Sequence, residues 1–211
     1  MITKTLLLPS AGLVLALALT LTQSLPARAD DAYPQPSPYP VSWELTFDHA
    51  KPRRIVVQAP GDDAPIAYWY VTYHVVNNTD KDRIPFFPLF DMMTNDGQTI
   101  RSDNNIKPAV FDAIKEREHI KYLQSAVEIG GPLLQGEDQS KDGVAIWPEP
   151  NPKMGTFVIF ATGFWGESKT VKVGDKDVVL HKTLQLTYHL AADADSNGTA
   201  LQEQESRYVM R

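Results

Sequence analysis

The sequence contains no cysteine among its 211 residues. Disulfide bonds and a lipid-modified cysteine are therefore excluded. A cysteine nucleophile is excluded for the same reason, and no serine lies in the G-x-S-x-G turn that presents a catalytic hydroxyl. The folded chain must be held together by its hydrophobic core alone.

Long apolar runs are also scarce, and the clearest one extends from Thr5 to Thr22. Lys4 precedes it, and Ala27-Arg28-Ala29 follows it with the small-x-small pattern that signal peptidase recognises. Residues 1–29 are therefore expected to be a secretory signal peptide, and the mature protein to be secreted or periplasmic. An uncleaved N-terminal anchor is the alternative, because the run approaches the roughly 17 residues needed to span a bilayer. No transmembrane segment is expected after signal cleavage.

Positive charge is in short supply as well. Removing residues 1–29 takes two of the 20 basic residues, Lys4 and Arg28, and none of the 26 acidic ones, which leaves a formal charge of −8. Nucleic acids and anionic lipid surfaces repel a protein of this charge. We expect no nucleic-acid partner, and cations are mildly attracted.

The remaining 182 residues are enough for one domain and too few for two of comfortable size. Four prolines at alternate positions, from Pro34 to Pro40, impose an extended and poorly packed conformation. Residues 30–40 are therefore interpreted as a flexible lead-in, and residues 41–211 as a single domain.

Most of this domain shows apolar residues with a period of two, which is typical of half-buried strands. The longest such run, residues 67–76, carries Trp69, Val71, Tyr73 and Val75 on one face. The other face, with Tyr68, Tyr70, Thr72 and His74, is amphipathic. A strand of this kind has one side on the core and one side partly in water.

Helical spacing is found once, from Pro108 onward. Asp103 or Asn104 is the expected cap, with Val110, Phe111 and Ile114 lining one side and a continuation through Tyr122 and Leu123 allowed. Seven to nine short strands with one such insertion predict a mainly β chain. The expected fold is an immunoglobulin-like two-sheet antiparallel sandwich with one short helical insertion.

Four segments, KPRRIVVQAPG, YWYVTYHVVNNTDKDR, GVAIWPEPNP and RYVMR, carry a resemblance. They resemble uncharacterised secreted β-sandwich proteins of planctomycete-type bacteria, in which a strand ends in V-x-N-x-T. The resemblance covers most of the mature chain and involves strand and turn residues. It implies a bacterial envelope or extracellular location and brings no activity with it.

The stretch DADSNGTALQEQE, residues 193–205, begins like a calcium-binding loop. Asp193, Asp195 and Asn197 supply oxygens at positions 1, 3 and 5, and a glycine follows at position 6. Position 12 is Gln204, which offers one oxygen where a bidentate acid is needed. The three residues are candidate calcium ligands, and a polar turn between strands is the competing interpretation. The sequence predicts no cofactor, and calcium at this loop is the alternative.

Other candidate groups are weaker. Tyr68 and Tyr70 on the outer strand face, and Trp165 at a strand end, are candidate ligand-binding rings because a sandwich can present such rings to a sugar. His74 and His189 form a zinc or copper site only if their strands are neighbours. Glu116 and His119 have metal-site spacing, but such sites need a second copy that the sequence lacks.

These observations favour a secreted, non-catalytic binding or structural module of the bacterial cell envelope. Its expected partner is a protein or glycan of the envelope, of unknown identity. The alternative is a calcium-stabilised or carbohydrate-binding β-sandwich module. An enzyme ranks third, because no nucleophile, base and acid can be assigned from the sequence.

Overall fold

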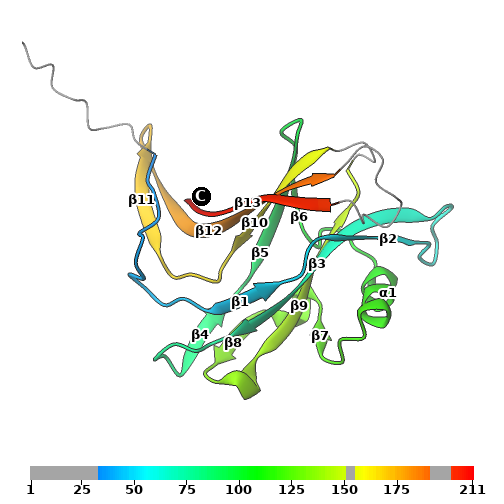
Figure 1. Ribbon diagram of the computed structural model, residues 1–211, viewed down its shortest axis with the longest axis horizontal. Coiled ribbons are helices and arrows are strands. Elements are labelled where there is room, and N and C mark those ends of the chain that lie inside the picture. The colour runs from blue at the N-terminus through cyan, green and yellow to red at the C-terminus, as the bar shows by residue number, and fades with distance from the viewer. Residues whose placement is uncertain (1–32, 151–154, 191–200) are drawn as a thin grey trace, which may run out of the picture. The chain divides into compact units, whose positions relative to one another are not determined.

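The computed structural model describes residues 33–150, 155–190 and 201–211 of the chain. Contacts divide the chain into two units, Met1–Tyr33 and Pro34–Arg211, and every element below belongs to the second. This unit is mainly β, with several antiparallel sheets, as predicted (Figure 1). No helix in the described part of the chain is long and apolar enough to cross a membrane.

The first sheet has the order β1-β3-β9-β7, and β2 also pairs with β3. Its strands are β1 (Thr46–His49), β2 (Arg53–Val57), β3 (Ile66–Val76), β7 (Leu123–Gln124) and β9 (Lys141–Pro148). β1 pairs with the end of β3 and β2 with its beginning, so together they form one interrupted edge strand. β7 runs parallel to β9, which departs from the purely antiparallel arrangement that the sequence predicts.

The second sheet has the order β11-β12-β10-β5-β6, with β13 also paired to β12. Its strands are β5 (Leu89–Thr94), β6 (Thr99–Arg101), β10 (Thr156–Thr162), β11 (Ser168–Val173), β12 (Lys176–Leu190) and β13 (Leu201–Met210). A small third sheet pairs β4 (Arg83–Phe86) with β8 (Gly131–Leu134). The last strand is longer than the RYVMR segment suggests, because β13 pairs with β12 from Leu201 onward.

Residues 163–167 leave the second sheet between β10 and β11 and join the two large sheets. The Leu45 N–H donates to the Phe164 carbonyl and the Gly166 N–H to the Trp43 carbonyl, both at 2.9 Å. The excursion carries Phe164 into the interior, where its side chain is fully buried. It begins at Gly163, whose φ of 97° suits glycine.

A single hydrophobic core lies between the two large sheets. It contains the inward residues of β3 that the sequence predicts, namely Trp69, Val71, Tyr73 and Val75. Apolar residues of the second sheet complete it, including Phe90, Met92, Phe157, Ile159, Leu186 and Tyr188. The alternation along β3 therefore identifies its core face correctly.

A second, smaller cluster covers the opposite face of β3 and β9. Helix α1 (Pro108–Glu118) buries Val110 and Ile114 against Tyr70 and its neighbours. Arg53 of β2 forms an ion pair of 2.7 Å with Glu118, and the Arg117 guanidinium donates to the Arg54 carbonyl at 2.7 Å. The insertion thus shields the outer face of the first sheet from solvent (Figure 1).

The start of the helix agrees with the sequence, and its cap and its end do not. Pro108 lies in the first turn as expected, but the N-cap residue is Lys107 rather than Asp103 or Asn104. The helix ends at Glu118 because His119 takes a left-handed conformation with a φ of 55°. The continuation through Leu123 is therefore wrong, since Leu123 belongs to β7. A second short helix, α2 (Ala126–Ile129), and a 3₁₀ turn, η1 (Glu137–Gln139), follow it.

The V-x-N-x-T segment has a structural role. Asn77 is fully buried, and its side-chain amide donates to the carbonyls of Lys81 at 2.9 Å and Leu133 at 3.2 Å. Its side-chain oxygen accepts from the Thr79 hydroxyl at 2.7 Å. The motif therefore closes the turn after β3 and attaches it to β8.

The described part of the lead-in contacts the second sheet. The Ser37 N–H donates to the Glu167 carboxylate at 2.8 Å, just before β11. Glu167 is buried, with 4% of its surface exposed, and its second carboxylate oxygen has no hydrogen-bond partner among the described residues. These contacts attach residues 35–37 to the domain.

Candidate functional site

Three cavities of the described residues lie around the insertion that follows β6. Their volumes are about 360, 590 and 220 Å³. The first lies between the start of α1 and α2, and is called the Asp103 pocket below. It is lined by Asp103, Ile106, Lys107, Pro108, Phe111, Asp112, Ser125, Ala126, Val127, Glu128 and Ile146.

The loop between β6 and α1 places Asp103 in this pocket. Asp103 and Asn105 have positive φ angles of 62° and 57°, which Asp and Asn tolerate better than most residues. The Asp103 N–H donates to the Ile146 carbonyl of β9 at 2.7 Å, and the Ser102 N–H donates to the Phe90 carbonyl at 2.9 Å. The unusual backbone is thus fixed by bonds to both large sheets.

Helix α2 forms the opposite wall through a capping box. Both the Ser125 N–H and its hydroxyl donate to the Glu128 carboxylate at 2.9 Å. These bonds hold the pKa of Glu128 below its usual value. The box fixes one carboxylate and one hydroxyl at the rim, and Val127 beside them is almost fully exposed.

Electrostatically, Asp103 is the unusual member of the pocket. Burial raises the pKa of its carboxyl to about 6, although hydrogen bonds from Ser102 and from the Ile146 backbone act in the opposite direction. No cationic side chain of the described residues forms an ion pair with Asp103. Perturbed carboxyls in cavities are frequent at functional sites.

Lys107 is the one cationic residue in the lining, and it is already engaged. Its ammonium group lies 2.6 Å from the Asp62 carboxylate and also donates to the Pro60 carbonyl at 3.3 Å. The hydrogen bond from Lys107 lowers the pKa of Asp62. Lys107 therefore neutralises Asp62 and leaves Asp103 without a counter-charge.

The cavity of about 590 Å³ is open and polar, and it combines Lys115, Lys121 and Lys141 with Glu128, Asp138 and Asp142. The Lys141 ammonium donates to the Ile129 carbonyl at 2.9 Å, and burial lowers the pKa of Lys141. With charges of both signs in equal number, this cavity favours no particular ligand.

The cavity of about 220 Å³ contains a histidine–carboxylate pair. His74 Nδ1 lies 2.7 Å from Asp142 Oδ1, and its Nε2 lies 3.8 Å from Glu137 Oε1. The condition for a zinc or copper site at His74 and His189 is not met, because the two residues lie in different sheets. In the part of the chain that the structure describes, no group of three His, Asp or Glu side chains is arranged to hold a metal ion.

The three aromatic candidates do not face solvent. Tyr68 and Tyr70 lie under α1 with 6% and 0% of their surfaces exposed, and Trp165 is 5% exposed beside Phe164. The Tyr70 hydroxyl donates to Glu118 of the same helix. The prediction that these rings project outward is wrong, since the insertion covers one pair and the excursion buries the third.

The calcium candidates Asp193, Asp195 and Asn197 lie outside the described residues, so the calcium loop stays a prediction. Of the two acids near its end, Glu203 accepts a hydrogen bond of 3.4 Å from the Tyr188 hydroxyl, and Glu205 lies 3.6 Å from Arg207. Both belong to β13.

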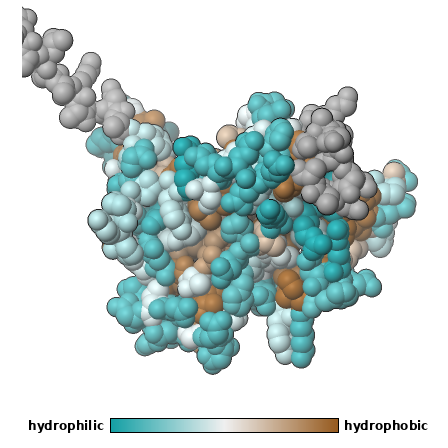
Figure 2. Space-filling view, viewed as in Figure 1, coloured by the Kyte–Doolittle hydropathy of each residue, from teal (hydrophilic) through white to brown (hydrophobic). Residues whose placement is uncertain are grey.

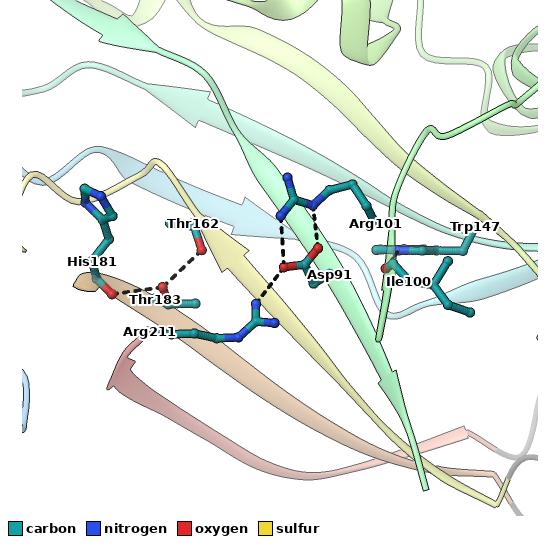
Figure 3. A network of polar contacts seen from close by, with 8 residues as sticks. All are labelled: Asp91, Ile100, Arg101, Trp147, Thr162, His181, Thr183 and Arg211. Atoms are coloured by element: carbon teal, nitrogen blue, oxygen red, sulfur yellow. Dashed lines mark hydrogen bonds and ion pairs between the residues drawn. The ribbon is translucent and has the colours of Figure 1, made fainter. Parts of the chain in front are cut away.

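A separate charged network lies on the outer face of the second sheet (Figure 3). Asp91 of β5 accepts from Arg101 at 2.5 Å and from Arg211 at 2.7 Å, and the Arg211 guanidinium lies 4.3 Å from the centre of the Phe160 ring. The bonds from the two arginines hold the pKa of Asp91 below its usual value against the effect of burial. The single Asp91 carboxylate bonds both arginines, so the network fixes the end of the chain after β13 to β5 and β10.

Sequence reasoning missed the role of Asp103, which it assigned to helix capping. The usable signal is the run Ser-Asp-Asn-Asn at 102–105, because these residues tolerate left-handed turns as well as cap positions.

On the face seen in Figure 2, hydrophobic side chains are scattered among hydrophilic ones, and no single apolar patch stands out as an alternative site. Comparison with protein families, curated proteins and solved structures found no match to this chain.

Proposed function

We propose that the chain is a secreted, non-catalytic binding module of the bacterial cell envelope whose ligand occupies the Asp103 pocket. The observation that carries the proposal is the combination of a preformed cavity, an apolar wall and a half-buried carboxyl that has no cationic partner. Small-molecule and side-chain binding sites have this composition, with few polar groups on an apolar lining.

Two features favour binding over catalysis. No histidine lines the pocket in the described part of the chain, and the hydroxyl of Ser125 is engaged by Glu128. A nucleophilic mechanism needs a hydroxyl activated by an adjacent base. The carboxylate beside Ser125 is a weak base, because the capping box lowers the pKa of Glu128. The partner is then a protein or glycan of the envelope that is bound and released without chemical change.

The fold and the location belong to the same proposal. The two large sheets share one core, which supports an immunoglobulin-like sandwich with the insertion packed on its outer face. Export rests on the signal sequence in residues 1–29. N-terminal sequencing of the exported protein tests this point: a start at Asp30 is expected, and a start at Met1 would instead indicate an anchor.

The pocket is tested by a small-fragment screen followed by NMR of backbone amides. Bound fragments should shift amides of residues 103–112 and 125–128, and should be recovered chemically unchanged. Ala126→Phe places a ring at the pocket mouth and should abolish binding. Val179→Phe adds the same ring at an exposed position of the β11–β12 hairpin and should not. Binding that survives Ala126→Phe, or shifts confined to other regions, would contradict the proposal.

A further inference from the structure

We propose that the Asp103 pocket recognises a primary ammonium group at the end of a short alkyl chain, as on a lysine side chain of an envelope protein. This inference rests on the proposed function and adds the chemistry of the ligand. It follows from the charges, the wall and the size of the pocket.

The charges of the pocket are unbalanced. Asp103, Asp112 and Glu128 are acidic, and the single lining cation, Lys107, is bonded to Asp62 and Pro60. Lys115 acts on Glu128 from the neighbouring cavity, so Glu128 is partly compensated. Among the described residues, the hydrogen bonds to the Asp103 carboxyl come from Ser102 and from the Ile146 backbone, which are neutral groups. A carboxylate of this kind is stabilised by an incoming cation and repels an anion.

The wall of the pocket matches an alkyl chain. Ile106, Phe111 and Ile146 lie in the lining, and Ile146 is 2% exposed. Methylene groups gain free energy on such a surface, whereas the hydroxyl groups of a sugar would lose water without finding partners there. An amino sugar therefore fits the wall less well than a lysine stem.

The size of the pocket points the same way. Its volume of about 360 Å³ is at the lower end of the range for ligand sites, roughly 300–1,000 Å³. A side chain of lysine length occupies part of this space with its ammonium group near Asp103, and the remainder admits the backbone that carries it. Phosphate-bearing ligands carry the wrong charge for this pocket, and polyaromatic ligands are too large for it.

The experiment uses the exported protein at pH 7.5 and compares two probes that differ by one group. Nα-acetyl-lysine methylamide carries the ammonium group, and Nα-acetyl-norleucine methylamide has a methyl group in its place. We expect the lysine probe to bind roughly tenfold tighter than the norleucine probe, because its ammonium group forms a hydrogen bond with the charged Asp103 carboxylate. Amide shifts in residues 103–112 and 125–128 locate both probes in the pocket.

Variants separate the carboxylate from the cavity. Asp103→Asn keeps the shape of the side chain and tolerates the positive φ. It should lower the affinity for the lysine probe about tenfold and change the affinity for the norleucine probe less than about twofold. Asp80→Asn removes one exposed carboxylate from the turn after β3 and should leave the affinity for both probes unchanged.

The possible results are distinct. Equal affinity for the two probes would overturn the ammonium preference while leaving the pocket as a binding site. Tighter binding of glucosamine than of the lysine probe would overturn the assignment to a lysine-type side chain. No binding of either probe, together with a negative fragment screen, would overturn the proposed function itself.

Discussion

Removing the charge of Asp103 should make the protein more stable at neutral pH. Burial raises the pKa of this carboxyl to about 6, compared with 3.8 for an ordinary Asp. The folded state therefore holds the proton more tightly than the unfolded state does. The contribution of Asp103 to stability is fully present below pH 3.8 and is lost as the pH rises through 6.

The size of the effect follows from the shift. A difference of about two pKa units corresponds to about 3 kcal/mol, and partial exposure of the side chain reduces this figure to about 1–3 kcal/mol. Asp103→Asn keeps the same number of atoms and can still accept the bonds from Ser102 and Ile146. It should raise the free energy of unfolding by about 1–3 kcal/mol at pH 7.5 and by almost nothing at pH 4.

Urea denaturation of both proteins at the two pH values measures this difference. Asp112→Asn, at an exposed position of α1 in the same lining, is the matched control, and it should change the free energy of unfolding by less than about 0.5 kcal/mol. An equal stability difference at pH 4 and pH 7.5, or a destabilisation at pH 7.5, would refute the reasoning. A gain in stability at the cost of binding is the usual sign of a group retained for function.

Three other changes test the fold and the calcium loop. Phe164→Ala should lower the free energy of unfolding by about 3–5 kcal/mol, because it opens a cavity where the excursion joins the sheets; a loss under 1 kcal/mol in urea denaturation would contradict that role. Asn77→Ala should cost about 2–3 kcal/mol, since the Lys81 and Leu133 carbonyls lose their partner; an unchanged thermal midpoint would show that the motif does not hold the turn. Millimolar calcium should raise the thermal midpoint relative to excess chelator, because binding adds roughly 1.4 kcal/mol of stability when calcium stands at ten times its dissociation constant. The double replacement of Asp193 and Asp195 by Ala should abolish that shift, and a shift that persists would place the calcium elsewhere.

The period-two pattern predicts the core face of β3 because every second residue meets the same environment along one strand. The pattern cannot show what covers the opposite face. Tyr68 and Tyr70 have hydroxyl groups that suit a wet surface, yet α1 buries both rings, and the Tyr70 hydroxyl is satisfied by Glu118. Helix α1 begins at Pro108, about 40 residues further along the chain, so local periodicity carries no information about it.

The excursion at residues 163–167 and the pocket escaped prediction for related reasons. Trp165 follows a strand and resembles a rim residue, and only its pairing with Glu44, far away in the sequence, reveals that it is buried. Asp103 precedes a helix, where caps and left-handed turns favour the same residues. Its position depends on a backbone hydrogen bond to Ile146 of β9, which no local pattern connects to it.

The measurement that tests the account most directly is an NMR titration of the Asp103 Cγ signal, with and without saturating Nα-acetyl-lysine methylamide. The free protein should show a pKa of about 6 for this carboxyl. The bound cation should lower the pKa, because a nearby positive charge favours the ionised form. A pKa near 3.8 in the free protein, or one that the ligand leaves unchanged, would contradict the claim that Asp103 is an uncompensated carboxyl that receives the ligand's charge.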